Sequence, residues 1–200
     1  MRRMLVAAAI LAAFAGGASA AEPQKAVFAG GCFWCVEADF DKVPGVLDTV
    51  SGFTGGTVEN PSYKQVTYGD TGHYEAVEIT YDPDKVSYEE LVDIFWRTVD
   101  PTDAGGQFCD RGESYRTAVF VANEAERAAA EASKAEAAAA LGQEIVTPIV
   151  EAGAFWPAEE HHQNYYEKNP LRYKYYRWGC GRDERIEALW GDAAHRGLAS

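Results

Sequence analysis

Two periods of apolar residues follow one another along the chain, and they predict strands and helices in alternation. Short buried runs and partial period-two alternation predict strands at 25–30, 46–52, 73–81, 115–121 and 144–150. Apolar residues at helical spacing predict helices at 32–40, 87–99, 158–168 and in an Ala/Glu-rich segment that opens at Asn123. Strands interleaved with helices, in an order that mixes hairpins with crossovers, indicate an α+β fold.

We expect this fold to be a two-layer α/β plait, that is, a ferredoxin-like mixed sheet with helices packed on it, followed by a less regular C-terminal segment. The alternative is a doubly wound nucleotide-binding sheet. The glycine pairs Gly30-Gly31 and Gly55-Gly56 lack the spacing of a phosphate-binding fingerprint, which disfavours that alternative. At helix starts, Ser87 with Glu90 forms a capping box, and Asn60-Pro61 has the form of a cap followed by proline at the first helical position.

The segment from Lys25 to Phe40 joins a buried strand, two glycines and a helix. This order places Cys32 in the first turn of the helix. Backbone N–H groups without partners and the helix dipole favour an anion at that position, and stabilisation of its thiolate makes a cysteine nucleophilic. Cys32 is therefore our candidate nucleophile, and Cys35 lies one turn further on, roughly on the same side.

The first 20 residues have the layout of a cleavable secretory signal peptide. Arg2 and Arg3 precede an apolar run from Met4 to Phe14, and small residues follow, ending in an Ala-x-Ala pattern at 18–20. The apolar run is too short to span a bilayer; the alternatives are an uncleaved anchor or a mis-assigned start codon. We expect export to the periplasm or the exterior, and one mature domain at 21–200 with a single hydrophobic core.

The balance of charges is acidic and excludes some partners. The formal net charge is −13 at pH 7, and loss of Arg2 and Arg3 would change it to −15. Such a charge argues against nucleic acids and anionic membrane surfaces as partners, and no later stretch is apolar enough to cross a membrane. We expect a soluble monomer after signal cleavage. The charge cluster Arg182–Arg185 is interpreted as a solvated face.

Four cysteines, at 32, 35, 109 and 180, enter an oxidising compartment if the chain is exported, where an even number usually indicates structural disulfides. A domain of this size does not need such bonds, and one between Cys32 and Cys35 closes almost no loop. Haem attachment requires histidine where Val36 stands. Zinc requires two more ligands, and neither the adjacent histidines nor the other cysteines have ligand spacing, so we expect no metal. The Cys-x-x-Cys pair alone leaves redox chemistry and a structural disulfide open.

Two aromatic residues, Phe33 and Trp34, separate the cysteines of this pair. They offer an apolar surface suited to a methyl or thioether group. Phe33 serves equally well as a core residue. Trp34 faces away from the buried stripe of the predicted helix, which favours a role at the surface.

Seven segments in order along residues 25–190 resemble the peptide methionine sulfoxide reductase A family. They are Gly31-Cys32-Phe33-Trp34, Ser51-Gly52-Phe53-Thr54-Gly55-Gly56, Asn60-Pro61-Ser62-Tyr63, Thr71-Gly72-His73-Tyr74-Glu75-Ala76-Val77, Asp100-Pro101-Thr102, Gly106-Gln107-Phe108-Cys109-Asp110-Arg111-Gly112 with Ser114-Tyr115-Arg116, and Pro157-Ala158-Glu159 with His162-Gln163. Seven ordered segments are specific, where one tetrapeptide would only be suggestive.

The resemblance implies an enzyme that reduces methionine S-sulfoxide, free or in proteins, and it implies a role for each matching residue. Cys32 would attack the sulfoxide sulfur and become a sulfenic acid. Glu75 would protonate the departing oxygen, and Tyr63 and Tyr115 would hydrogen-bond to it. The other roles fall to Asp110, which would organise water and hydrogen bonds near the thiol, and to Phe33 and Trp34, which would hold the substrate's methyl group.

The family uses no cofactor and draws electrons from an external dithiol, usually thioredoxin, so we expect a thioredoxin-like donor as partner. Many members have glycine after Phe-Trp and carry resolving cysteines in a Gly-rich C-terminal tail, and this chain departs from both patterns. Cys35 is our first candidate for the resolving cysteine because one helical turn fixes its distance from Cys32. Cys180, between two glycines, is the second. Cys109 is close to the site if the match holds, or is only a small buried side chain.

Two other functions remain open from the sequence. One is an exported thiol–disulfide oxidoreductase, which would act on disulfides without a sulfoxide. The other is a non-catalytic binding domain stabilised by a Cys32–Cys35 disulfide, with its aromatic residues facing a methionine-rich partner. If the chain is the exported reductase, its role is the repair of oxidised exported proteins.

Overall fold

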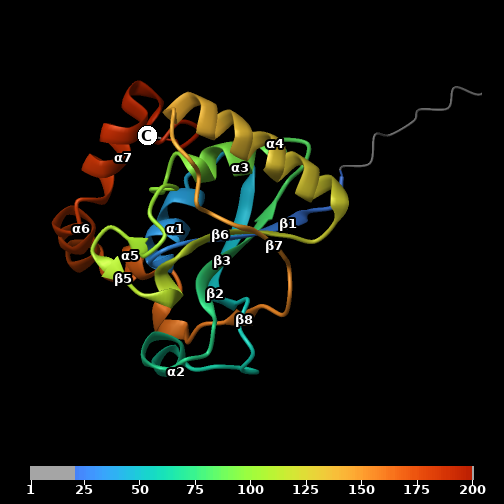
Figure 1. Cartoon of the computed structure of the whole chain (residues 1–200). Helices are drawn as coiled ribbons and strands as arrows, with labels where there is room; N and C mark the ends of the chain where they lie inside the picture. Colours follow the sequence, from blue (N-terminus) through green and yellow to red (C-terminus); the bar gives the residue numbers. More distant parts are fainter. Residues whose placement is uncertain (1–20, 200) are drawn as a thin grey trace, which may run out of the picture.

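A six-stranded mixed sheet runs through the computed structural model, which describes residues 21–199 (Figure 1). Its strands are β1 (Gln24–Gly30), β2 (Val46–Thr54), β3 (Tyr74–Tyr81), β6 (Thr117–Val121), β7 (Ile149–Glu151) and β8 (Trp156–Pro157). Their order across the sheet is β7-β6-β1-β3-β2-β8. Only the edge pair β6–β7 is parallel. A separate two-stranded ladder joins β4 (Gly106–Gln107) to β5 (Asp110–Arg111).

Helices connect the central strands and pack against the sheet. They are α1 (Phe33–Phe40), α2 (Tyr63–Tyr68), α3 (Tyr88–Trp96), α4 (Glu124–Leu141), α5 (Tyr165–Lys168), α6 (Pro170–Gly179) and α7 (Arg182–Trp190), with short 3-10 turns η1 (Glu113–Tyr115), η2 (Glu160–His162) and η3 (Gly191–Ala193). Because α1 lies between β1 and β2, and α3 precedes β6, the central elements follow the order β-α-β-β-α-β. The predicted α+β class, with helices packed on a mixed sheet, is confirmed.

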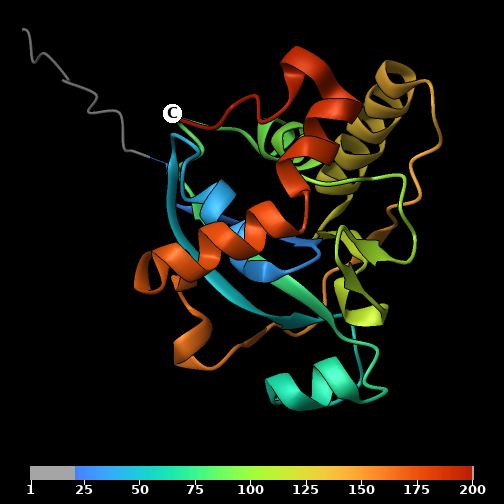
Figure 2. The ribbon, with the colours of Figure 1, turned by 90° about the vertical axis from the view of Figure 1, so that its left-hand side faces the viewer.

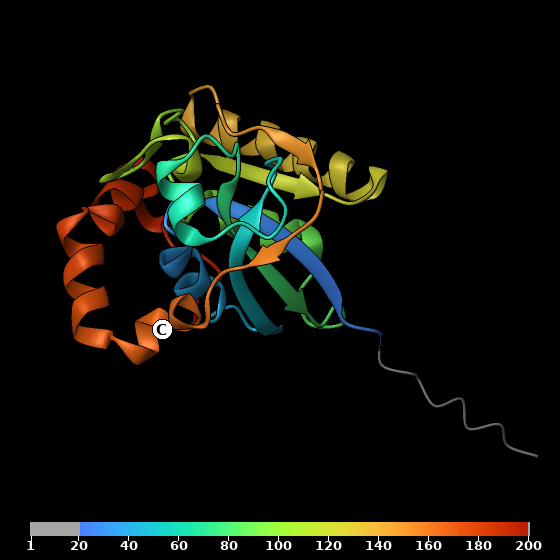
Figure 3. The same ribbon diagram turned by 90° about the horizontal axis from the view of Figure 1, so that it is seen from below.

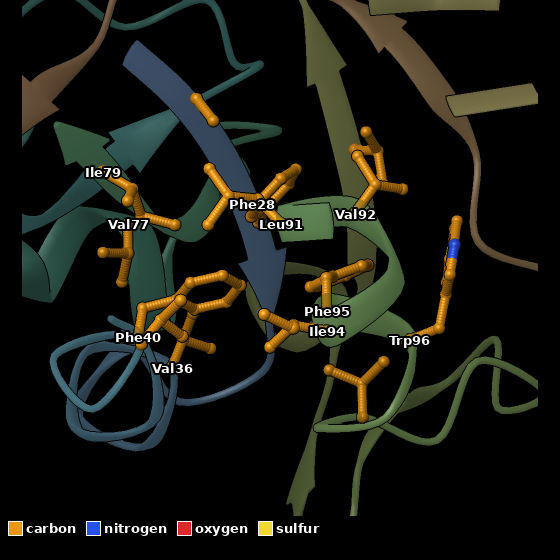
Figure 4. Close-up of a cluster of buried hydrophobic side chains, with 14 of the residues drawn as sticks. Phe28, Val36, Phe40, Val77, Ile79, Leu91, Val92, Ile94, Phe95 and Trp96 are labelled. Atoms are coloured by element: carbon orange, nitrogen blue, oxygen red, sulfur yellow. The ribbon is translucent and has the colours of Figure 1, made fainter. Parts of the chain in front are cut away.

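The main core lies between the sheet and helices α1 and α3 (Figure 4). Phe28 of β1 is fully buried and stacks on Phe95 of α3, with ring centroids 5.1 Å apart. Phe40 of α1 approaches the same ring at 5.4 Å. Burial of each such side chain contributes roughly 1.5–3 kcal/mol. A smaller cluster, built on alanines and Phe120, covers the opposite face of the sheet.

Helix α1 is covered on both sides, which matters for the cysteines at its start. Val36 and Phe40 face the sheet. Cys35 and Ala38 face the other way, against Tyr165 and Tyr173 of the C-terminal helices. Figures 2 and 3 show these C-terminal helices wrapped around the outer side of α1. The expected less regular C-terminal segment is therefore wrong: α6 starts with proline in its first turn and ends in the short turn before α7.

Several local predictions hold and others shift. The Ser87–Glu90 capping box forms, and Asn123 caps α4. The predicted helix at 158–168 is broken into η2 and α5 because Asn164 has a left-handed backbone with φ of 51°. The first turn of α2 is capped by Ser62 and not by Asn60, whose own φ is 44°.

The predicted strand at 144–150 is reduced to the three residues of β7. The predicted signal peptide at 1–20 lies outside the described residues. Within residues 21–199, no helix combines the length and apolarity needed to cross a bilayer.

Candidate active site

Two glycines at the end of β1 position Cys32. Gly31 has φ of +81°, and a Cβ on it would lie 2.5 Å from Cβ of Gln107, so both the backbone angle and the close packing require glycine. A Cβ on Gly30 would lie 2.8 Å from Cγ2 of Val36. The tight approach allows the strand to turn directly into α1 with Cys32 as its N-cap residue. Cys32 is 6% exposed.

The thiols of Cys32 and Cys35 share a hydrogen bond and titrate together. Burial, together with the hydrogen bond to Cys35 and the nearby charge of Glu75, raises the pKa of Cys32. The hydrogen bond donated by Cys32 lowers the pKa of Cys35 to about 7 against the effect of burial, and the charges of Arg182 and Arg177 add to this effect. The pair therefore holds its negative charge mainly on the Cys35 side, with Cys32 as the proton donor.

Glu75 of β3 lies beside the start of α1 and is 1% exposed. Its Oε2 accepts the backbone N–H of Phe33 at 3.1 Å. Its Oε1 is buried and has no hydrogen-bond partner in the part of the chain that the structure describes. Burial raises the pKa of Glu75 to about 8 in spite of the Phe33 N–H, and the charges of Asp110 and Cys35 add to the shift. Glu75 is therefore protonated at neutral pH, with one oxygen free to donate.

Two tyrosines and an aspartate complete the polar side of the site. The hydroxyls of Tyr63 and Tyr115 hydrogen-bond to each other. Burial and the charge of Glu75 raise the pKa of both, so they remain donors. Asp110 accepts a hydrogen bond from the hydroxyl of Tyr176, and burial raises the pKa of Asp110. Tyr176 also acts on the thiol of Cys32, whose pKa it lowers against the effect of burial.

The apolar side of the site is an aromatic cluster. The ring of Phe33 is fully buried and lies 6.1 Å from that of Tyr63. The indole of Trp34 is half-buried and stacks on Tyr165, with centroids 3.6 Å apart and an interplanar angle of 7°. Trp34 Nε1 donates to Nδ1 of His162 at 3.1 Å. Burial lowers the pKa of His162 to about 4, so its ring is neutral.

The sequence alone did not point to four residues that the structure places here: His162 as the acceptor for Trp34, Tyr165, Tyr176 and Arg182. Three of them lie on C-terminal helices more than 120 positions from Cys32, and no local pattern signals such a contact. Arg182 was expected on a solvated face and is 2% exposed instead. Its Nη1 and Nη2 donate to the carbonyls of Gly30 at 3.2 Å and Thr98 at 2.7 Å.

The second candidate for the resolving cysteine has another partner in the structure. Cys180 forms a disulfide with Cys109, across a sequence separation of 71 residues. Its sulfur is therefore not a thiol in this state. Cys109 is exposed and not the small buried side chain we considered. Cys32 and Cys35 are free thiols.

A buried thiol pair beside a protonated carboxyl, with hydroxyl donors on one side and aromatic rings on the other, defines a thiol-dependent oxidoreductase. Comparison with known proteins identifies the family. Residues 24–194 match the family model described as peptide methionine sulfoxide reductase.

Curated relatives cover nearly the whole chain. The chain is 56% identical to peptide methionine sulfoxide reductase MsrA 2 of Rhizobium meliloti (strain 1021), over 91% of each chain. It is 53% identical to the protein of the same name from Caulobacter vibrioides (strain ATCC 19089 / CIP 103742 / CB 15), over 96% of this chain and 100% of that one. The crystal structure of reduced Mxr1 from Saccharomyces cerevisiae superimposes with a TM-score of 0.69 at 32% identity, over 74% of this chain and 86% of that one.

The chain belongs to the peptide methionine sulfoxide reductase A family. The resemblance noted in the sequence is thus confirmed. The protein is an oxidoreductase that reduces methionine sulfoxide.

Proposed function

We propose that this enzyme is exported and reduces the S epimer of methionine sulfoxide, free and in oxidised exported proteins, through a sulfenic acid on Cys32. The proposal assigns attack to Cys32, proton donation to Glu75 and oxygen binding to Tyr63 and Tyr115. Phe33 and Trp34 take the substrate's methyl group. The epimer preference rests on the family resemblance alone.

The first step transfers one oxygen atom from the substrate to Cys32. The Cys32 sulfur attacks the sulfoxide sulfur and forms a sulfur–sulfur bond while Glu75 protonates the oxygen. The oxygen then bonds to the Cys32 sulfur as its bond to the substrate sulfur and the sulfur–sulfur bond both break, which releases methionine. Overall, the thiol of Cys32 and methionine sulfoxide give Cys32 sulfenic acid and methionine, so the substrate sulfur gains two electrons that Cys32 loses. Cys32 gives up its proton to the Cys35 side of the pair, and the hydroxyls of Tyr63 and Tyr115 stabilise charge on the oxygen.

The second step removes the oxidation from Cys32. Cys35 attacks the Cys32 sulfur, a disulfide forms, and the sulfenic oxygen leaves as water. An external dithiol protein then reduces the disulfide and is itself oxidised, without a cofactor. Two observations support Cys35 as the resolving cysteine: its sulfur is hydrogen-bonded to Cys32, and Cys180 is bonded to Cys109.

The observation that carries the proposal is the carboxyl of Glu75, buried and protonated with a free Oε1, at the first turn of the helix that begins at Cys32. A non-catalytic binding domain has no use for such a group, since an unpaired buried carboxyl oxygen costs stability. A group that protonates the departing oxygen must itself carry a proton at neutral pH, as this buried carboxyl does.

The direct test is turnover of each methionine sulfoxide epimer with dithiothreitol, combined with trapping of the sulfenic acid by a dimedone probe in Cys35→Ser. We expect methionine from the S epimer alone and a label on Cys32. Exchange activity on model disulfides without sulfoxide dependence would support a thiol–disulfide oxidoreductase instead. A permanent, inert bond between Cys32 and Cys35 would support the binding domain.

Export rests on the N-terminal pattern of residues 1–20 and has a separate test. Expression of the full chain in a Gram-negative host, followed by fractionation and N-terminal sequencing, should yield a mature protein that begins near Ala21 outside the cytoplasm. A matched chain that lacks residues 2–20 should stay in the cytoplasm. Recovery of the uncleaved full chain in the cytoplasm would refute export and leave the enzymatic proposal intact.

A further inference from the structure

Four charged side chains lie behind α1, on the side that faces the C-terminal helices. Asp39, one turn after Cys35, is 1% exposed. Arg177 of α6 binds Asp39 with Nη1 at 2.8 Å and Asp183 with Nη2 at 2.6 Å. Arg182 of α7 is 2% exposed. Two buried cations thus face one buried carboxylate and a second carboxylate at the rim.

Arg177 is paired closely with carboxylates, and Arg182 only loosely. Arg177 contacts two carboxylates within 2.8 Å. Arg182 has only neutral partners at hydrogen-bond distance, the carbonyls of Gly30 and Thr98, and the ring of Phe108 lies 4.7 Å from its guanidinium carbon. Its Nε is 4.0 Å from Oδ2 of Asp39 and has no hydrogen-bond partner among the described residues. A buried cation in this state is costly unless an anion lies near it.

A second anion on this side of α1 is the Cys35 thiolate, one turn before Asp39, whose Oδ2 lies 4.0 Å from Nε of Arg182. Arg182 holds the carbonyl of Gly30, two residues before Cys32, so the guanidinium is fixed at the base of the loop that carries the thiols. The titratable and charged groups that face Cys35 from the elements around it are Cys32 at the N-cap of α1, Asp39 on α1, Glu75 on β3, Tyr165 on α5, Tyr173, Tyr176 and Arg177 on α6, and Arg182 on α7. Of the two arginines, Arg182 lowers the pKa of Cys35 more than Arg177 does.

We propose that Arg182 is the positioning residue for the second step of the reaction: its buried charge, held between the Gly30 carbonyl and Asp39, keeps Cys35 as the thiolate that attacks Cys32 sulfenic acid. This inference rests on the proposed function. In this step the Cys35 sulfur forms a bond to the Cys32 sulfur, and the sulfur–oxygen bond of the sulfenic acid breaks. The oxygen leaves as hydroxide and takes a proton from the solvent, which received one when Cys35 ionised. Arg182 touches no substrate atom and acts through Cys35.

The experiment separates the two steps in a single turnover of the pre-reduced, full mature chain. Methionine is counted by chromatography for the first step, and the Cys32–Cys35 disulfide is counted by mass spectrometry after acid quench for the second. Both are followed from pH 5.5 to 9. The variants are Arg182→Gln, Arg182→Lys and, as a matched control on the same helix, Arg185→Gln, whose arginine is half exposed and binds Asp100.

We expect Arg182→Gln to slow disulfide formation about tenfold at pH 7, because the midpoint of its pH profile rises by about one unit. The rate of methionine formation should change less than about twofold. Arg182→Lys should restore most of the midpoint, and Arg185→Gln should match the unaltered enzyme. A folded Arg182→Gln with an unshifted midpoint would overturn the inference, and so would an equal loss in both steps, which would mean a structural role.

A second variant keeps the test decisive if Arg182→Gln does not fold. Asp39→Asn removes the carboxylate that raises the pKa of Cys35, so the midpoint for disulfide formation should move below that of the unaltered enzyme. An unchanged or higher midpoint would contradict the inference. Failure of the proposed function looks different, since the unaltered enzyme would then form no methionine at all.

Discussion

The two sides of helix α1 offer opposite electrostatic environments only one turn apart. On the side of Glu75, the nearby titratable groups are carboxyls and tyrosines, and burial raises the pKa of Glu75 to about 8. On the side of Cys35, two arginines lie behind the helix, and the pKa of the thiol is lowered to about 7. One side thus keeps a proton at neutral pH and the other releases one.

In the proposed reaction, this difference allows one short helix to serve two chemical steps with different requirements. Loss of oxygen from a sulfoxide requires an acid, whereas resolution of a sulfenic acid requires a thiolate. Because Glu75 and Cys35 lie in separate surroundings, each group can have the pKa that its own step requires. The hydrogen bond between Cys32 and Cys35 connects the two sides, because it joins the attacking thiol to the stabilised one.

Removal of the Cys32 thiol, which connects the two sides of α1, should have the largest effect on activity. We expect Cys32→Ser to lower sulfoxide reduction by more than about 10⁴-fold, since the nucleophile is lost. Cys32→Ala, which leaves no donor at this position, should raise the pH midpoint for alkylation of Cys35 above about 7. Turnover assays and iodoacetamide labelling measure the two effects. Full activity in Cys32→Ser would refute the mechanism.

Loss of the proton donor Glu75 should have the second largest effect on activity. Glu75→Gln keeps the acceptor for the Phe33 N–H but cannot donate a carboxyl proton, and we expect methionine formation to slow by roughly 10²–10⁴-fold. In the unaltered enzyme, this step should slow as the pH rises past about 8, where Glu75 ionises. Rapid-quench measurement across pH tests both statements. An unchanged rate in Glu75→Gln, with Cys32 still alkylated, would remove Glu75 from this role.

The same variant allows an independent check of the raised pKa. Because the pKa of Glu75 is raised from 4.5 to about 8 on folding, its contribution to stability is fully present below pH 4.5 and is lost progressively up to pH 8. The loss at pH 7 is about 3 kcal/mol. Glu75→Gln should therefore unfold at higher denaturant concentration than the unaltered protein at pH 9, and not at pH 4. If the difference in free energy of unfolding between the two proteins did not change with pH, the pKa of Glu75 would not be raised in the folded protein.

The thiolate side is tested by Cys35→Ser, with an effect confined to the second step. We expect one equivalent of methionine per enzyme at close to the unaltered rate, followed by accumulation of Cys32 sulfenic acid. Steady-state turnover with a thioredoxin-like donor should nearly stop, because that donor reduces disulfides. Mass spectrometry of the Cys32 peptide checks this outcome. A disulfide between Cys32 and Cys180 after turnover would instead assign resolution to Cys180.

The two sides of α1 differ in how far the sequence predicts them. The strand, the two glycines and the helix start are local features, so the position of Cys32 follows from residues 25–40. Glu75 and the two tyrosines were found through ordered family segments. Neither approach predicted that Glu75 accepts the Phe33 N–H, because this contact depends on the pairing of β3 with β1.

The cation side was not predictable in the same way. A charged cluster after glycine is usually solvated, and Arg182 is an exception because tertiary contacts bury it against the carbonyls of Gly30 and Thr98. The break between η2 and α5 has a similar origin, since the N–H of Asn164 donates to the buried Glu37 of α1 at 3.0 Å. Tertiary contacts thus decided both features against the local pattern.

The smallest effect on catalysis is expected from loss of the Cys109–Cys180 disulfide, which fastens the end of α6 to the residue before Asp110. Cys109→Ser with Cys180→Ser should change turnover only a few-fold, because the Tyr176–Asp110 hydrogen bond can form without the disulfide. Stability should fall by about 4 kcal/mol, since the bond closes a loop of 71 residues. Steady-state kinetics and guanidinium unfolding measure the two quantities. The single variant Cys109→Ser serves as control, because it leaves the thiol of Cys180 free. If this variant is active while the double variant is not, the Cys180 thiol takes part in the reaction. The groups that act on Cys32 would then include one at the end of α6 as well as those on the two sides of α1.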